Sequence, residues 1–193
     1  PDLFVMTGDY VSSSIHFLPD CLAEVNRIRT KYGTYACLGN HEHFHGDMEY
    51  LGRTFLKYEI SLLNNSHRIV NTSDGLLALI GIEDLVEGDP DLEKAVAKID
   101  KDIPRILLSH RPEIFPQAAS RGITLTLAGH YHGGQIALKL PGFKFSLADL
   151  RTQYTEGLFR IKDSYMYVTS GLGTTFTPVR FNAPPEITIL NLT

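Results

Sequence analysis

The sequence of 193 residues has few cysteines, no long apolar run and no cluster of basic residues. Its two cysteines, Cys21 and Cys37, fall in a helix-like and a strand-like stretch, and free buried thiols are favoured over a disulfide. No stretch approaches the ~20 apolar residues of a membrane helix, and no signal-peptide pattern opens the chain. Lys and Arg form no long run and the net charge is -4, so no nucleic-acid-binding patch is expected.

The chain opens on Pro1, without an initiator Met, and leads straight into a strand-like stretch. We therefore expect an N-terminally truncated chain that has lost the first strand of a sheet, an exposed edge being the consequence. A signal or membrane anchor would belong to the lost part, so membrane association is expected only through that missing segment.

Apolar, β-prone segments alternate with amphipathic ones over most of the chain, which is typical of α/β domains. Strands are predicted at residues 3–7, 34–38, 61–64, 68–71, 76–82, 105–109 and 123–128, and helices at 17–32, 48–58, 92–99 and 112–120. The tail differs, because strands at 157–162, 165–170 and 186–192 follow one another with Gly and Pro turns between them. The sequence predicts one domain over residues 1–193, a layered β-sandwich of a mixed and a largely antiparallel sheet flanked by helices.

Several predicted strands end in polar residues that can bind metal ions. These residues are Asp9, Asn40, His110, His130 and His132. Ligands bind at the carboxyl ends of strands in open α/β sheets, so we expect these side chains to share one site. Imidazole, carboxylate and amide oxygen together suit a pair of divalent ions such as Mn, Zn or Fe better than a structural zinc site.

Such a pair of ions would hold a hydroxide between them and neutralise a phosphate in an in-line displacement. Asp9 is the expected bridging carboxylate. His41 follows Asn40 directly and can lie near the ions without binding them, which suits a group that gives a proton to the leaving oxygen. Glu42 can orient His41 or simply face solvent.

Each motif has a simpler explanation when it is taken alone. Gly8-Asp9 can be an ordinary turn, Asn40 a helix cap and His110 a core or surface histidine. The two histidines of 129–134 are hardest to explain in that way, since glycines flank them. The ordered set therefore favours a metal site, while His16, His43 and His45 are interpreted as loop residues and His67 as a surface residue.

The blocks Gly8-Asp9, Gly39-Asn40-His41-Glu42, His110 and Gly129-His130-Tyr131-His132 resemble the calcineurin-like metallophosphoesterase superfamily. The resemblance spans essentially the whole chain. Gly133-Gly134-Gln135 and the segments 178–181 and 184–187 are similar to a bacterial phosphodiesterase branch that is often exported or membrane-associated. The family's Asp-x-His block, which would precede Gly8-Asp9, is absent from this sequence.

The resemblance implies a four-layer α/β/β/α fold and two divalent ions. Asp9 would bridge them, Asn40, His110 and His130 would hold the second ion, His132 would help to hold the first, and His41 would assist the leaving group. Without Asp-x-His, the first ion lacks two of its usual ligands. The chain as given is then impaired as an enzyme, although the intact protein is active.

The expected function is metal-dependent hydrolysis of a phosphoester, more specifically of a phosphodiester. The alternative is a catalytically impaired fold that serves as a protein-interaction scaffold, although a scaffold has no need to keep His41. Candidate substrate-binding residues are His43, Tyr131, Gln135 and Arg180, with His45 beside them. They leave a nucleotide, a lipid headgroup and a cell-wall phosphodiester open as substrates, and both an exported or membrane-associated and a cytoplasmic location open.

Overall fold

The structure, a computed structural model, describes residues 1–192 apart from Gly46 and the side chain of His45. The first third of the chain builds a parallel three-stranded sheet from β1 (Phe4–Met6), β2 (Thr34–Ala36) and β3 (Ile60–Leu62), in that order. The connections between these strands contain α1 (Leu18–Val25), α2 (Asn40–His45) and α3 (Met48–Lys57). This arrangement confirms the predicted strand–helix–strand unit.

The second sheet has six strands in the order β10-β11-β7-β6-β5-β4. Its strands are β4 (Ser66–Thr72), β5 (Gly75–Gly81), β6 (Arg105–Leu108), β7 (Leu125–Ala128), β10 (Gly157–Ile161) and β11 (Ser164–Val168). The central pairs are parallel, and the edge pairs β4–β5 and β10–β11 are antiparallel. The expectation of a largely antiparallel second sheet therefore holds only at its edges, because helical crossovers α4 (Leu92–Val96) and α5 (Phe115–Ser120) connect the central strands.

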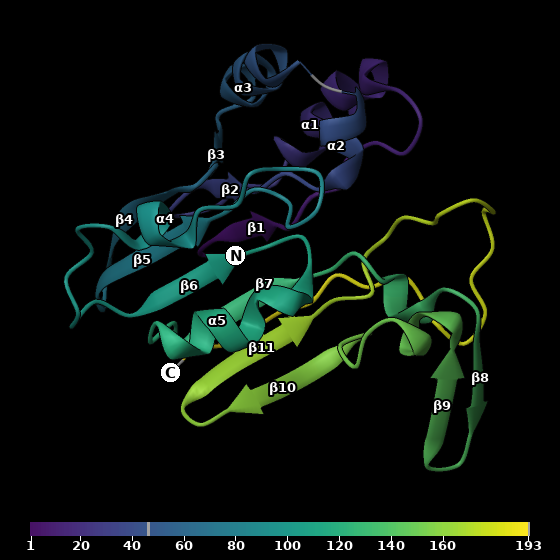
Figure 1. Cartoon of the computed structure of the whole chain (residues 1–193). Helices are drawn as coiled ribbons and strands as arrows, with labels where there is room; N and C mark the ends of the chain where they lie inside the picture. Colours follow the sequence, from purple (N-terminus) through teal and green to yellow (C-terminus); the bar gives the residue numbers. More distant parts are fainter. Residues whose placement is uncertain (46, 193) are drawn as a thin grey trace.

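Four layers result from the packing of these elements (Figure 1). Leu22 of α1 and Phe55 of α3 pack on the outer face of the three-stranded sheet. Leu79 of β5 lies between the two sheets, against Tyr35 and Cys37 at β2. Ile80, its neighbour in β5, faces the opposite way and packs with α4 and α5, as the alternation of side chains along a strand requires. The expected sandwich flanked by helices is confirmed.

Two segments differ from the sequence prediction. The helix expected over 17–32 is shorter and ends at Val25. After it, the backbone N–H groups of Arg27 and Ile28 each bond to the carbonyl oxygen three residues earlier, as in a 3-10 turn. Residues 186–192 form no sheet ladder, and Glu186 instead bonds to Tyr167 and Ser170 through its side chain. The tail thus contributes two strands rather than the three predicted.

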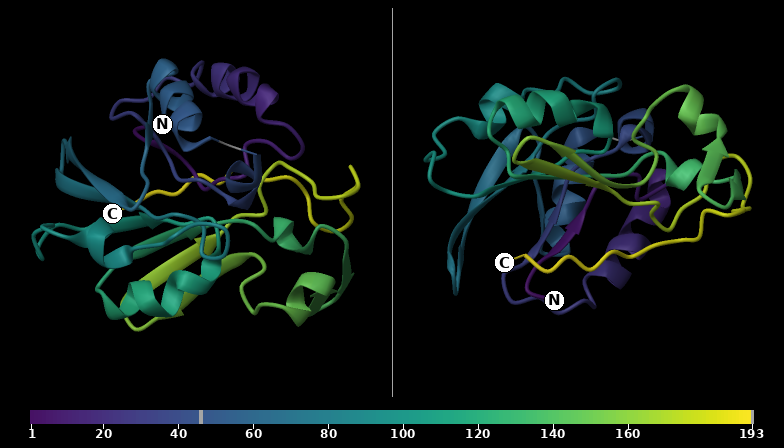
Figure 2. Two further views of the ribbon diagram at one scale, coloured as in Figure 1. Left: turned by 45° about the horizontal axis from the view of Figure 1, so that its top comes forward. Right: turned by 90° about the horizontal axis from the view of Figure 1, so that it is seen from below.

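A hairpin that the sequence prediction missed lies between the metal-ligand candidates and the tail. It consists of β8 (Ala137–Leu140) and β9 (Phe143–Ser146), which form a two-stranded sheet with each other. Both views in Figure 2 place this hairpin and the loop through residues 172–181 at the same end of the molecule. Cys21 and Cys37 are free thiols, as predicted, with Cys37 buried and Cys21 half-buried.

Candidate metal centre

Two glycines let the loops after β1 and β2 approach each other closely. Gly8 has φ +95°, and a Cβ built on it would lie 2.4 Å from the backbone nitrogen of Gly39. A Cβ on Gly39 would in turn lie 2.3 Å from Asp9 Oδ1 and 2.9 Å from His110 Nδ1. Since real side chains do not tolerate such contacts, both positions require glycine if Asp9 is to reach the other candidate ligands.

Glu42 fastens these two loops together. Its side chain is completely buried, and Oε2 accepts hydrogen bonds from the N–H groups of Asp9 at 2.8 Å and Gly39 at 2.9 Å. Oε1 accepts from the N–H of Tyr10 at 2.7 Å. Burial raises the pKa of this carboxyl group and the charge of Asp9 adds to the effect, against the opposing influence of the backbone donors. Glu42 is therefore buried rather than solvated, and its two carboxylate oxygens hold the backbone that positions Asp9.

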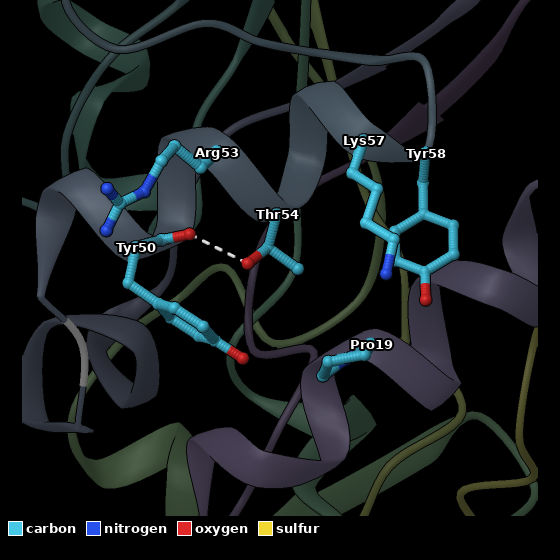
Figure 3. A pocket seen from close by; sticks show the side chains of 6 residues that line it. All are labelled: Pro19, Tyr50, Arg53, Thr54, Lys57 and Tyr58. Atoms are coloured by element: carbon cyan, nitrogen blue, oxygen red, sulfur yellow. Dashed lines mark hydrogen bonds between the residues drawn. The ribbon is translucent and has the colours of Figure 1, made fainter.

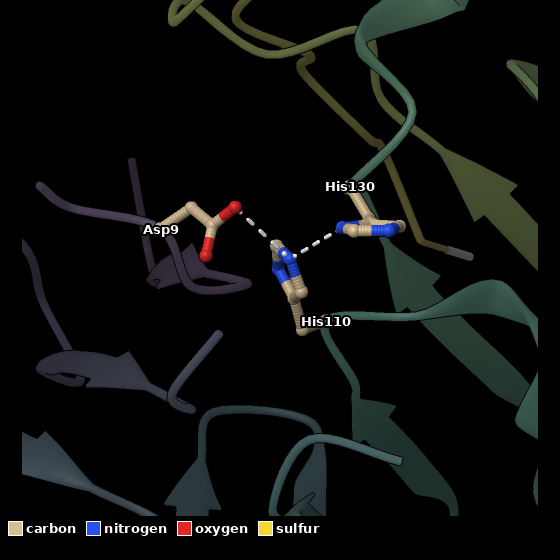
Figure 4. A group of neighbouring side chains, drawn as sticks. All are labelled: Asp9, His110 and His130. Atoms are coloured by element: carbon tan, nitrogen blue, oxygen red, sulfur yellow. Dashed lines mark hydrogen bonds and ion pairs between the residues drawn. The ribbon is translucent and has the colours of Figure 1, made fainter. Parts of the chain in front are cut away.

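Three candidate ligand atoms surround His110 Nε2, and Figure 4 shows two of their side chains, Asp9 and His130. This nitrogen lies 3.1 Å from Asp9 Oδ2, 3.1 Å from Asn40 Oδ1 and 2.9 Å from His130 Nδ1. On the other side of the ring, Nδ1 donates a hydrogen bond to the carbonyl oxygen of Thr7 at 2.7 Å. A proton on Nε2 therefore makes this ring positively charged and bonds it to Asp9, and a divalent ion would take the place of that proton with Nε2 as its ligand.

This geometry fits a divalent ion. Ligand atoms that lie about 2.0–2.2 Å from one ion are roughly 3 Å apart along the edges of its coordination shell, and the three distances from His110 Nε2 have this size. Among the described residues, one group of three histidine, cysteine or acidic side chains could hold an ion, and it consists of Asp9, His110 and His130. Asn40 is buried and adds an amide oxygen. The structure brings together these four of the five residues that the sequence predicts as metal ligands, and their role as ligands remains a prediction.

Electrostatic interactions couple the side chains of this cluster. Burial alone would raise the pKa of Asp9, but the hydrogen bond and positive charge of His110 outweigh it and lower the pKa to about 2. Burial works against a charge on His110, yet Asp9 raises the pKa of this imidazole. The pKa of His130 falls to about 3, first through burial and then through the charges of His110 and Arg111. Asp9 is therefore anionic and His130 neutral near pH 7.

Arg111 and Asp84 support His130 from behind, and sequence reasoning missed both. Arg111 Nη1 donates to His130 Nε2 at 2.9 Å, while Arg111 Nε lies 2.9 Å from Oδ2 of the fully buried Asp84. Since a guanidinium has only donors, a neutral His130 carries its proton on Nδ1. An ion at Nδ1 would require this proton to move to Nε2 and the contact with Arg111 to open. The signal was present in the sequence, because both residues follow a buried strand, as the recognised ligands do.

His41 and His132 lie beside this cluster. His41 Nδ1 donates to the carbonyl oxygen of Ser12 at 2.9 Å, which turns Nε2 to within 4.0 Å of Asp9 Oδ2. His132 has φ +53° and lies outside the group of three, with Nδ1 at 3.4 Å from Gln135 Oε1. Burial and then the charge of Arg180 lower the pKa of His132. His41 therefore lies next to Asp9, whereas His132 lies outside the group of three, and the roles of both histidines remain proposals.

The four substrate-binding candidates have diverse surroundings. The Tyr131 hydroxyl donates to Glu113, and burial followed by this bond raises the pKa of Tyr131 to about 12. Gln135 bonds to the backbone of the 172–181 loop, and the Arg180 guanidinium donates to five backbone carbonyls, including that of His132. His43 Nε2 is buried without a hydrogen-bond partner among the described residues. The side chain of His45 lies outside the described part of the chain.

A hollow of about 240 Å³ lies elsewhere, on the helical side of the three-stranded sheet between α1 and α3 (Figure 3). Its cations already have partners, since Arg53 pairs with Glu49 at 3.0 Å and Lys57 lies over the Tyr58 ring. It shares no residue with the metal cluster, and we assign no role to it.

Comparison with known proteins places the chain in a family. Residues 1–135 match the calcineurin-like phosphoesterase family. An uncharacterized metallophosphoesterase of Helicobacter pylori is 35% identical over 200 residues, covering 99% of this chain and 51% of that protein. A protein named a phosphodiesterase from Escherichia coli is 30% identical, covering 100% of this chain and 70% of that protein.

Other relatives differ in size and in their printed names. The chain covers 50% of a Campylobacter jejuni metallophosphoesterase and 68% of one from Bacillus subtilis. A Danio rerio relative, 31% identical over 97% of this chain and 45% of its own length, is named a transmembrane protein with a metallophosphoesterase domain. The chain therefore spans about half to two thirds of the length of many relatives that it matches.

Among solved structures, a phosphopantetheinyl hydrolase from Mycobacterium tuberculosis has a similar fold. The TM-score is 0.54 over 86% of this chain and 77% of that one, with 11% sequence identity. At this identity the likeness concerns the fold alone, and it confirms the expected metallophosphoesterase-like architecture.

Proposed function

The chain belongs to the calcineurin-like phosphoesterase family, and from this premise we propose that it is the catalytic domain of a metal-dependent phosphodiesterase. The observation that carries the proposal is the meeting of Asp9, Asn40 and His130 around His110 Nε2. An amide, a carboxylate and two imidazoles on four separate loops have no packing reason to converge, whereas a divalent ion gives them one. The proposed domain is residues 1–193.

Two divalent ions, Mn, Zn or Fe, would supply a bridging hydroxide as nucleophile and neutralise charge on the phosphate. Asp9 would hold both ions, and Asn40, His110 and His130 would complete the second site. His132 would serve the first site. The sequence contains no Asp-x-His ahead of Gly8 to add to His132.

His41 is proposed to give a proton to the leaving oxygen. Its Nδ1 is engaged by the Ser12 carbonyl, so Nε2 is the nitrogen that faces the cluster, 4.0 Å from Asp9 Oδ2. This separation is too long for a direct hydrogen bond, and it places Nε2 beside the cluster, where a leaving oxygen would lie. The proposed residues around the substrate remain His43, Tyr131, Gln135 and Arg180. Gln135 and Arg180 would act indirectly, because they hold the 172–181 loop beside His132.

A diester is preferred over a monoester because a relative that matches the whole chain is named a phosphodiesterase. For location, relatives named as transmembrane proteins favour a membrane-associated protein. In the described part of the chain, no helix is long and apolar enough to cross a bilayer.

The test is hydrolysis of a chromogenic bis-aryl phosphodiester and of the matching monoester with added Mn, using the full-length protein. We expect diester hydrolysis that is lost in His130→Ala and kept in His67→Ala, because His67 lies on β4 and bonds to Ala95. Preference for the monoester would refute the diester assignment. Folded, metal-loaded protein that cleaves neither compound would favour the interaction scaffold instead.

A further inference from the structure

Two charged residues, Asp84 and Arg111, lie beside the candidate metal ligands although neither belongs to the group of three. Strands β5, β6 and β7 are parallel neighbours in the second sheet, so their carboxyl ends lie at one edge. Asp84 follows β5, Arg111 follows β6 and His130 follows β7. The topology of the sheet therefore brings a guanidinium group and a buried carboxylate to the edge that carries the metal cluster.

Asp84 fixes the guanidinium group of Arg111 in place. The Asp84 side chain has no exposed surface, and its two oxygens accept from Arg111 Nε at 3.1 and 2.9 Å. Oδ1 also accepts from the backbone N–H groups of Val86 and Glu87, each at 3.0 Å, so the loop after β5 holds the carboxylate itself. A guanidinium that is held through Nε keeps its two Nη atoms for other partners.

The two Nη atoms of Arg111 lie beside His130 with donors to spare. Nη1 donates to His130 Nε2 at 2.9 Å, and this contact must open when His130 Nδ1 serves as a metal ligand. Nη2 has no hydrogen-bond partner among the described residues, and it is not one of the buried atoms that lack a partner there. Solvent therefore reaches Nη2, in a side chain that is 17% exposed.

Arg180, the guanidinium that the sequence suggested for contact with the substrate, has its donors engaged instead. Its three nitrogens donate to five backbone carbonyls. These carbonyls belong to His132, Ser170, Gly171, Gly173 and Ala183. An arginine whose donors are satisfied gains little from a phosphate, whereas one with open donors gains charge-assisted hydrogen bonds. The comparison favours Arg111 over Arg180 as the cation for a substrate.

We propose that Arg111 binds the phosphate group of the substrate and that Asp84 positions it for this contact. The proposal rests on the proposed function and adds to it a residue that touches the substrate. The two Nη atoms of one guanidinium match two oxygens of a phosphate group, which the single ammonium of a lysine does not. Because these atoms lie beside His130, the contact would hold the phosphate at the ligand cluster and neutralise part of its charge. Asp84 acts only through Arg111.

Binding of inorganic phosphate tests this proposal without relying on hydrolysis. Phosphate is titrated by calorimetry into the full-length protein loaded with Mn. The wild type is compared with the double variant Asp84→Asn/Arg111→Gln, which removes both charges of the pair and so leaves no buried charge without a partner. We expect the double variant to bind phosphate more weakly by about tenfold or more, since a charge-assisted contact is lost.

Metal affinity is measured on the same proteins. It should be retained in the double variant, because the contact of Arg111 with His130 Nε2 opens when Nδ1 is a ligand and so does not hold a bound ion. A fall in metal affinity of about 10- to 100-fold is typical of residues that hold a ligand in place. Such a fall would overturn the proposal, because the pair would then act through His130 rather than on the phosphate.

Two further variants complete the comparison. Arg111→Lys keeps a positive charge opposite Asp84 without the planar pair of donors, so it should fold and still bind phosphate more weakly than the wild type. Arg53→Gln removes an exposed arginine that pairs with Glu49 at 3.0 Å on α3, and it should bind phosphate as the wild type does. Thermal unfolding of each variant checks that it is folded.

The outcomes separate this proposal from the proposed function. Absence of phosphate binding by the metal-loaded wild type, or equal phosphate affinity in the wild type, the double variant and Arg111→Lys, would overturn the role of Arg111 even if the diester is cleaved. Protein that binds phosphate through Arg111 but cleaves neither aryl ester would support the phosphate site and refute the phosphodiesterase.

Discussion

Glu42 accepts a hydrogen bond from the backbone N–H of Asp9 at 2.8 Å, although the two residues are 33 positions apart. The same carboxylate oxygen accepts from the Gly39 N–H, so one side chain joins the loops that follow β1 and β2. The position of the proposed bridging carboxylate is thus fixed by a residue that binds no ion. This relationship yields the first prediction.

Glu42→Gln should destabilise the protein and weaken metal binding together. A glutamine offers one acceptor oxygen, whereas both Glu42 oxygens accept backbone hydrogen bonds, so buried N–H groups lose their partner. We expect the free energy of unfolding to fall by about 1–3 kcal/mol, and metal affinity by roughly tenfold. Urea denaturation and metal titration measure the two effects. Glu49→Gln, on the exposed surface of α3, is the control, with a change within about 0.5 kcal/mol.

Gly39→Ala should damage the site while Gly52→Ala should not. The new Cβ at position 39 would lie 2.3 Å from Asp9 Oδ1, so Asp9 or the loop must move. At Gly52, inside α3, a Cβ meets nothing within 4 Å, and the better helix propensity of alanine should stabilise the protein by about 0.5–1 kcal/mol. Thermal unfolding with and without added metal measures both variants. Unchanged metal binding in Gly39→Ala would contradict the close approach described here.

Added divalent metal should stabilise the folded chain, and removing it with a chelator should reverse the effect. At a free metal concentration of 100 times Kd, the expected gain is about 2.7 kcal/mol. His110→Ala should abolish the gain, because its Nε2 contacts the other three candidate ligands. His67→Ala should retain it. A gain of equal size in His110→Ala would show that metal binds elsewhere.

Asp84→Asn should lower stability near neutral pH but not in acid. Burial by itself raises the pKa of Asp84, but the N–H groups of Glu87 and Val86, together with the Arg111 charge, lower it overall. A carboxyl group with a depressed folded pKa stabilises the protein above its unfolded pKa of about 3.9, and this contribution disappears as the pH falls through the lower folded pKa. Above that range we expect a loss of about 3–5 kcal/mol, since Arg111 is left without its partner. Urea unfolding from pH 2 to pH 7 should show the two proteins converging in acid; a constant difference would contradict the ion pair.

The sequence anticipated the main elements of the fold and the four loops that build the cluster. Strand ends followed by Gly-Asp, Gly-Asn, His and Gly-His predicted a shared site, and Asp9, Asn40, His110 and His130 do lie together. It did not anticipate the directions of the strands in the second sheet, because pairing partners are distant along the chain. Nor did it find β8–β9, where alternating Leu, Lys and Phe were not interpreted as a hairpin.

Local patterns determined what depends on neighbouring residues: the buried strands, the amphipathic α3, and the polar residues at strand ends that carry the chemistry. Tertiary structure alone decided which of those residues meet and what supports them. The burial of Glu42, the Asp84–Arg111 pair behind His130 and the carbonyl contacts of Arg180 all join residues from separate elements. The packing of whole sheets decides which side chains meet across the fold, and no local sequence pattern encodes these contacts.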